Sequence, residues 1–310
     1  MPVSTTLAES AKLSQDMLVR GVIENVITVN QFYQILPFQA IEGNALTYNR
    51  ESTLGDVMTA TVGTEITANA AATWTQVSSS LTTIIGKAAI NGLIQATRSN
   101  YTDQAQAQIA SKAKSVGRKY QDMLINGDSG SVATEFDGIA SLVSAGQTIS
   151  ATATDGDVLT LRKLDDALSM VTAKDGEVDY IMMNVRDINT YMDILRGMGG
   201  ASIDQVVTLP SGVQIPAYRG TPIFRNDWIG ITDTQGDSTN ASAIYMGTLD
   251  DGSMSNGIAG LTAMGDAGIR IEGPYKEPNY DEEYYHVKFY SGLANFSDKG
   301  LVAITGIIPA

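Results

Sequence analysis

The feature that most constrains this chain is a long amphipathic segment between Thr102 and Asn126. Its apolar positions recur with a period of 3.6 residues, which is the spacing of one helix face. These positions are Ile109, Ala113, Val116, Tyr120 and Met123. We therefore predict one helix over residues 102–126, about 36 Å long at 1.5 Å per residue. The β-rich segments on either side are expected to lie across it.

Both ends of this predicted helix carry helix-boundary signals. Thr102 or Asp103 can accept hydrogen bonds from the free N–H groups of the first turn. Asn126 and Gly127 supply a left-handed stop, a conformation that glycine adopts without strain. Gly117 weakens the middle of the helix by roughly 1 kcal/mol relative to alanine, so tertiary contacts must support it there.

Four basic residues gather in the middle of the helix. They are Lys112, Lys114, Arg118 and Lys119. One interpretation is a solvated helix face, and the other is weak contact with phosphates that does not depend on base sequence. No aromatic side chain is interleaved for base stacking, which argues against specific recognition of nucleic acid.

Composition indicates a folded chain with an uneven charge distribution. The 310 residues are 43% hydrophobic, which suits one large core or two modest ones. Residues 1–130 carry 9 Lys and Arg against 10 Asp and Glu, whereas the remaining residues carry 11 against 24. An acidic surface does not attract nucleic acid or anionic membrane, so we expect any contact with nucleic acid through the first part.

The sequence offers little support for catalysis, for a metal site or for a cofactor. There is no cysteine, and the one histidine, His286, lacks a partner for a metal site or a triad. The acidic run 281–283 lacks the spacing of a calcium loop, and Asp165 with Asp166 is interpreted as a solvated helix face. Glycine-rich phosphate motifs are also absent. We predict no enzyme, no cofactor and no metal, while a spatial pair of carboxylates stays open.

Nothing in the chain predicts a membrane partner. No stretch approaches 18 apolar residues, and the first ten residues lack the pattern of a secretion signal. A capping-box pattern at Thr6–Glu9 predicts a helix to about Glu24. This helix either packs on its own domain or reaches a neighbouring subunit.

A long hairpin is predicted before the helix. Residues 41–50 read as a strand, residues 51–72 are rich in Thr, Ala and Gly, and a second strand runs from Trp74 towards Ile90. A hairpin without a core of its own is marginal in water. We expect it to lie on another surface, and a neighbouring subunit is one candidate. The alternative is a flexible surface loop.

The rest of the chain alternates helices with strands. Helices are predicted over 157–173 and 185–196, and strands over 180–184, 243–247, 287–293 and 301–308. This alternation predicts an α+β or α/β subdomain.

The order of these elements resembles that of the major capsid proteins of tailed bacteriophages, which have the Hong Kong 97-type fold. The resemblance covers nearly the whole chain and rests on five phrases taken together. These are VITVNQFYQILPFQAIEGNALTYNRE (26–51), EFDGI (135–139), YIMMNVRDINTYMDILRG (180–197), YRGTPIFRND (218–227) and FYSGLANFSDKGLVAITGI (289–307), joined by the helix 102–126.

The resemblance implies an α+β, Hong Kong 97-like capsid fold in four parts. Residues 1–40 would form an N-terminal arm, and residues 41–90 an extended β-hairpin, the E-loop, with its base strands. Residues 91–155 and 270–295 would form the peripheral domain with its spine helix. Residues 156–269 and 296–310 would form the axial domain.

The resemblance also implies a function and partners. The chain would assemble as hexamers and pentamers into an icosahedral shell enclosing the genome of a tailed double-stranded DNA phage. Packaged DNA would meet the basic residues of the helix, and a separate scaffolding protein, a portal and a decoration protein are expected partners. The protein would be part of the virion capsid, assembled in the cytoplasm of the bacterial host.

Two departures from the family bear on this expectation. Some relatives join hairpin lysines to neighbouring asparagines, but no lysine lies between Lys12 and Lys87 here, so we predict no such crosslink. The hairpin also begins by about residue 41, so we expect scaffolding, if it is needed, to come from a separate protein.

Three other functions stay open at this point. An encapsulin-like bacterial nanocompartment shares the fold and encloses protein cargo. A monomeric hydrolase using scattered carboxylates would form no particle. A secreted adhesin or surface-layer protein would need a secretion signal that the first residues lack.

Overall fold

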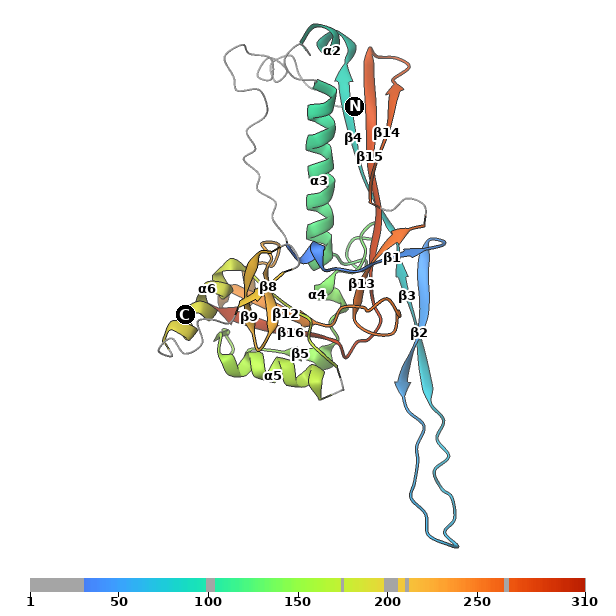
Figure 1. Ribbon diagram of the computed structural model, residues 1–310, viewed down its shortest axis with the longest axis vertical. Coiled ribbons are helices and arrows are strands. Elements are labelled where there is room, and N and C mark those ends of the chain that lie inside the picture. The colour runs from blue at the N-terminus through green and yellow to red at the C-terminus, as the bar shows by residue number, and fades with distance from the viewer. Residues whose placement is uncertain are drawn as a thin grey trace.

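The computed structural model describes residues 31–98, 104–173, 176–197, 206–209, 212–264 and 268–309. The strands in this part of the chain form sheets of five, nine and two strands. Figure 1 shows an elongated molecule, with a long helix and its sheet at one end and a projecting hairpin at the other. The predicted α+β class is confirmed.

The long helix α3 spans Gln104–Asn126 and uses the predicted apolar face. Val116, Tyr120 and Met123 are buried, and Ile109 packs against the same cluster. The predicted caps Thr102 and Asp103 lie outside the described residues, as does the predicted helix over residues 6–24.

A five-stranded sheet built on β15 (Glu282–Asn295) supports α3. β4 (Thr82–Asn91) and β14 (Ile269–Lys276) pair antiparallel with β15, and β13 (Ile258–Ala263) pairs with its last residues. β1 (Phe38–Ile41) runs parallel to β13. The ring of Tyr120 on α3 meets Phe289 on β15 edge-on, with ring centres 5.0 Å apart. These contacts supply the tertiary support that Gly117 requires.

The hairpin consists of β2 (Ala45–Thr53) and β3 (Thr73–Ser80), paired antiparallel. The prediction of a single strand from Trp74 towards Ile90 was wrong, because the chain changes sheet at Leu81 and continues as β4. The backbone N–H of Leu81 donates to the carbonyl oxygen of Asn44 at 2.9 Å, and its side chain packs beside the small cluster of Ile41 and Phe296. This contact turns the chain from one sheet into the other.

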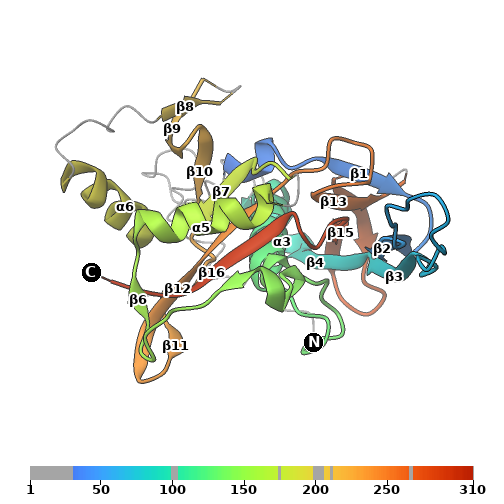
Figure 2. The ribbon, with the colours of Figure 1, turned by 90° about the horizontal axis from the view of Figure 1, so that it is seen from below.

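The nine-stranded sheet has the order β5-β16-β12-β7-β10-β9-β8, with β11 paired to β12 and β6 to β16. Figure 2, which looks along α3, shows this sheet on one side of the helix and β1, β13 and the hairpin on the other. The strand bounds are β5 Thr148–Ile149, β6 Asp157–Val158, β7 Tyr180–Met183, β8 Val206–Thr208, β9 Gln214–Tyr218, β10 Thr221–Arg225, β11 Asp233–Gln235, β12 Ser238–Gly247 and β16 Leu301–Ile308.

Both faces of the nine-stranded sheet are covered, because apolar residues occupy alternate positions on each strand. One face packs against α5 (Leu161–Thr172) and α6 (Val185–Gly197) and contains Ile181, Met183, Ile223, Ile244, Met246, Val302 and Ile304. The other contains Tyr180, Met182, Phe224, Tyr245, Leu301 and Ala303. The predicted helix start at Asp157 was wrong: Asp157 and Val158 pair with β16, and the Thr160 hydroxyl caps α5 by accepting from the N–H of Lys163.

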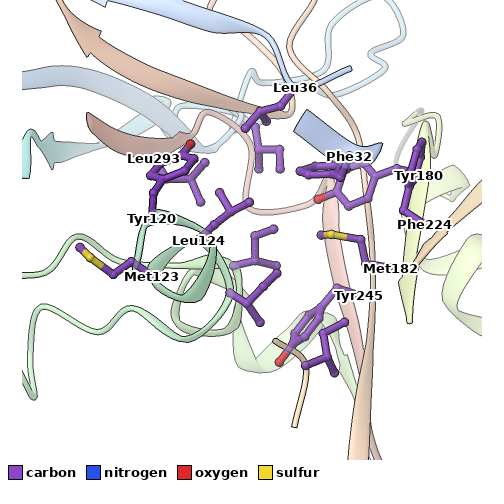
Figure 3. Close-up of a cluster of buried hydrophobic side chains, with 14 of the residues drawn as sticks. Phe32, Leu36, Tyr120, Met123, Leu124, Tyr180, Met182, Phe224, Tyr245 and Leu293 are labelled. Atoms are coloured by element: carbon purple, nitrogen blue, oxygen red, sulfur yellow. The ribbon is translucent and has the colours of Figure 1, made fainter. Parts of the chain in front are cut away.

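A large buried cluster joins α3 to this second face (Figure 3). It contains Tyr120, Met123 and Leu124 from α3, Tyr180 and Met182 from β7, Phe224 from β10, Tyr245 from β12, Leu293 from β15, and Phe32 and Leu36 from the segment before β1. The ring of Phe32 lies 4.9 Å from Tyr180 and 5.8 Å from Phe224, centre to centre. The short helices are α2 Gly92–Arg98, α4 Ile139–Leu142, η1 Gln31–Gln34 and η2 Ala145–Gln147.

The C-terminal end of α3 differs from the prediction. The N–H of Gly127 donates to the carbonyl oxygen of Met123 at 2.9 Å, but the φ angle of Gly127 is not positive. An added Cβ would instead collide with the carbonyl oxygens of Phe136 and Met123. The backbone at Gly138 crosses at the same point, and its N–H donates to the carbonyl oxygen of Gly127 at 2.9 Å. The predicted left-handed stop was therefore wrong, and the glycine is required by a close crossing of two backbone segments.

Candidate assembly and nucleic-acid surfaces

Within the described part of the chain, no other segment covers the hairpin tip. Every residue from 51 to 67 is exposed, including large apolar side chains. Leu54 is 79% exposed, Val57 93% and Ile66 77%. Because isolated apolar side chains at a surface are common but a concentrated group is not, this tip is a candidate contact surface.

The stem of the hairpin is held firmly, in contrast to its tip. The hydroxyl of Tyr48 donates to the carbonyl oxygen of Asn295 at 2.6 Å, and Nε of Arg50 donates to that of Phe296 at 3.1 Å. The Tyr48 and Phe296 rings also meet edge-on, 5.1 Å apart. The rigid stem therefore fixes the direction in which the tip projects.

A cleft of about 570 Å³ lies at the base of the hairpin. It is lined by Tyr48, Asn49, Arg50, Glu51, Ser52, Thr75, Met254, Ser255, Phe296, Ser297, Asp298 and Lys299. The lining mixes both signs of charge and contains no histidine. The Arg50 guanidinium is already committed to two backbone carbonyls of this wall.

The four basic residues of α3 divide between two helix faces. Lys112 and Lys119 are seven positions apart and share one side, whereas Lys114 and Arg118 are one turn apart on another side. Lys112 lies beside Gly86 of β4. The structure therefore places the four cations along the helix without gathering them into one patch.

Lys119 and Arg118 each contact partners within the chain. Nζ of Lys119 lies 2.7 Å from a carboxylate oxygen of Glu135 and 3.3 Å from one of Asp122, and the hydrogen bond to Glu135 raises the pKa of Lys119. The Arg118 guanidinium lies over the ring of Trp228, 5.1 Å from its centre. These contacts reduce the positive charge that the helix offers to a phosphate.

The remaining polar residues singled out from the sequence form no catalytic arrangement with one another. His286 lies beside the rings of Tyr275 and Tyr284, with ring centres 5.6 and 5.2 Å away, and opposite Glu272 and Lys87 on the neighbouring strands. Within the described residues, no group of three or more metal-ligating side chains comes together. No helix in this described part is long and apolar enough to cross a membrane.

The interpretation of Asp165 and Asp166 as a solvated helix face holds only for Asp166. Asp166 is exposed, but Asp165 accepts a hydrogen bond from the Tyr218 hydroxyl and lies 3.0 Å from the Arg219 guanidinium. Its partners come from the β9–β10 turn, which is distant in sequence. Helical periodicity alone could not have indicated this contact.

Sequence reasoning missed two polar clusters. One surrounds Trp228, whose Nε1 donates to Gln121 of α3 at 3.2 Å. The other surrounds Asp187, a buried carboxylate on α6 that accepts from the Ser242 hydroxyl at 2.6 Å and pairs with Arg186 at 3.2 Å. Burial raises the pKa of Asp187, although Ser242 and Arg186 oppose the shift. For the Asp187 cluster, the only signal in the sequence was an acidic residue in the apolar pattern of a predicted helix.

Comparison with models of known protein families and with curated proteins found no match. Comparison with solved structures found similar chains over the full length. The SrpI encapsulin from Synechococcus elongatus PCC 7942 is 16% identical, with 99% of this chain and 97% of that chain covered and a TM-score of 0.72. The capsid protein of a native GTA particle is 12% identical, with both chains covered at 100% and a TM-score of 0.64.

A phage capsid shows the same relationship. The capsid chain of Myoviridae phage XM1 is 10% identical, with 98% of this chain and 99% of that chain covered and a TM-score of 0.64. Identities this low carry an argument about fold alone. Together with the spine-like α3, the extended hairpin and the two larger sheets, they establish that the chain has the Hong Kong 97-type fold of viral capsid and encapsulin shells.

Proposed function

We propose that this protein is the subunit that self-assembles into the icosahedral capsid of a tailed double-stranded DNA phage. The observation that carries the proposal is the hairpin tip, which exposes large apolar side chains on a rigid stem in a fold used for closed shells. In such a shell a neighbouring copy would cover the tip. Closed symmetry would repeat this contact at every subunit.

The energetics favour a partner for the tip over a free loop. Burying a valine, leucine or isoleucine side chain contributes about 1.5–3 kcal/mol, and the tip offers several of them. A stable interface needs more than one such contact, so the tip acts together with other surfaces of the subunit. The role is structural and involves no catalysis.

The rest of the proposal follows the division of the chain. Residues 1–40 act as an arm, and residues 41–90 as the E-loop with its base strands. Residues 91–155 with 270–295 act as the peripheral domain with its spine helix, and residues 156–269 with 296–310 as the axial domain. Subunits form hexamers and pentamers in the virion capsid. Assembly takes place in the host cytoplasm with a separate scaffolding protein and a portal, and a decoration protein binds the finished shell.

An encapsulin-like nanocompartment is the second candidate. The observation that favours it is the TM-score of 0.72 to the SrpI encapsulin, which exceeds those of 0.64 to the GTA and XM1 capsids. Encapsulin and phage shells share the subunit fold, so the contents of the particle separate the two functions.

The deciding experiment is negative-stain electron microscopy of the full chain expressed with its scaffold, followed by extraction of the particle contents. Closed shells that contain double-stranded DNA after infection support the capsid function. Closed shells that contain one protein cargo and no DNA support the nanocompartment. A chain that stays monomeric with its scaffold present contradicts both.

Contact with packaged DNA is proposed for Lys112, Lys114, Arg118 and Lys119. The double variant Lys112→Gln with Lys114→Gln should bind duplex DNA more weakly. The slope of log affinity against log salt should fall by about one for each phosphate that is no longer neutralised. Lys276→Gln is the matched control, because its side chain is 84% exposed on β14. An equal salt slope in all three proteins would remove these lysines from the DNA interface.

A further inference from the structure

The contact between Trp228 and α3 is polar, unlike the apolar cluster beside it. Three residues of α3 meet Trp228: the Arg118 guanidinium stacks on the ring at 5.1 Å, Oε1 of Gln121 accepts from Nε1 at 3.2 Å, and Nδ2 of Asn126 donates to the backbone carbonyl at 3.0 Å. We call these four residues the Trp228 latch. It ties the C-terminal half of the helix to the loop that follows β10.

The loop on the other side of the latch is fixed to the nine-stranded sheet. The N–H of Asn226 continues the β10–β7 ladder by donating to Met183 at 2.9 Å, and its side chain accepts from the N–H of Trp228 at 3.0 Å. Nδ2 of Asn184 donates to the carbonyl oxygen of Ile229 at 2.9 Å, and Ile229 is buried. The indole is therefore positioned by the sheet, so the latch joins α3 to the nine-stranded sheet.

A second connection between α3 and the nine-stranded sheet is the large apolar cluster shown in Figure 3. The side chains of this cluster are closely packed and several of its rings meet edge-on, so it holds the helix against the sheet through many short contacts. Hydrogen bonds and a stacked cation act only within a narrow range of distance and angle. The latch therefore adds oriented polar contacts to those of the cluster.

We propose that the Trp228 latch sets the angle between α3 and the nine-stranded sheet, and through this angle the curvature at which copies of the chain close into a shell. The inference rests on the proposed shell function. In a shell of identical subunits, a small change in subunit shape is repeated at every interface and therefore changes the diameter.

The test compares the diameters of empty shells from latch variants and matched controls, so that DNA contact by Arg118 does not enter. Gln121→Leu and Arg118→Met weaken the latch at the helix surface, and Trp228→Ala removes it. Gln108→Leu on α3 and Arg162→Met, whose side chain is 90% exposed on α5, are the same substitutions outside the latch. Trp228→Phe retains a ring for Arg118 but loses the N–H donor.

The expected result is that wild type closes at one diameter, whereas the latch variants divide between two or more diameter classes. Trp228→Phe should lie between wild type and Trp228→Ala, and both controls should match wild type. Unchanged thermal midpoints of Gln121→Leu and Arg118→Met would establish that the subunit is still folded, so these two decide the matter if Trp228→Ala fails to fold.

Two outcomes overturn the inference, and they are distinguishable. If wild type and every folded latch variant close at one and the same diameter, the latch does not set curvature, although the shell function stands. If the unaltered chain forms no shell with its scaffold present, the proposed function fails and this inference fails with it.

Discussion

At the scale of single residues, the glycines in and near α3 have two different physical roles. Gly127 and Gly138 lie where two backbone segments cross, and a Cβ on either would collide with the carbonyl oxygen of Met123. Gly117 lies in the middle of α3 with nothing within 4 Å of an added Cβ. The same substitution should therefore change stability in opposite directions.

Gly138→Ala should lower the free energy of unfolding of the isolated subunit by about 1–3 kcal/mol, because the added methyl overpacks a backbone crossing. Gly117→Ala should raise it by about 0.5–1 kcal/mol, because alanine favours the helix and meets no obstacle. Urea denaturation of both variants beside wild type measures the two signs. A destabilised Gly117→Ala would contradict the open space around this position.

Asp187 predicts a pH dependence of stability. Burial raises its pKa in the folded chain above the unfolded value of about 3.9, so the folded state binds more protons in the pH range between these two values. Its contribution to stability is therefore largest at low pH and falls as the pH rises through the folded pKa. Asp187→Asn should remove this fall. The measurement is the difference in unfolding free energy between the two proteins from about pH 4 upwards, which cancels the other carboxylates.

At the scale of elements, the hairpin separates stability from assembly. Val57→Ser with Ile66→Ser should change the stability of the isolated subunit by less than about 0.5 kcal/mol, because both side chains are exposed. The yield of closed shells should fall strongly, because each substitution removes an apolar side chain that would pack on a neighbouring copy under the proposed function. Particle yield by sedimentation measures this effect.

The control for the hairpin is Val132→Ser, which changes an exposed valine outside the hairpin. This variant should assemble at the wild-type yield. If the hairpin variant also did so, the tip would be a free loop rather than a contact between subunits.

At the scale of the whole molecule, the shell should be held together without covalent bonds between subunits. No lysine lies between Lys12 and Lys87, so the hairpin has no amine for an isopeptide bond to a neighbouring asparagine. Purified particles boiled in detergent should give a single band at the subunit mass on a denaturing gel. A ladder of bands at multiples of that mass would refute this prediction.

The amino-acid sequence alone is enough to predict the regular elements whose apolar pattern is local. The periodicity of Val116, Tyr120 and Met123 predicts α3, and the apolar runs at 180–184 and 301–308 predict the two strands β7 and β16. These predictions succeed because a helix or strand exposes its buried face at a fixed spacing along the chain. The joint order of the elements was also enough to indicate the fold.

Only the tertiary structure decided where the chain changes sheet, why Gly127 is glycine and which side chains partner the cations of α3. The turn at Leu81 depends on Asn44, the crossing at Gly127 on Phe136, and the position of Arg118 on Trp228. Each partner comes from another part of the chain. The physical reason is that periodicity reports which face of an element is buried, whereas a hydrogen bond or a backbone crossing depends on what the fold brings to that face.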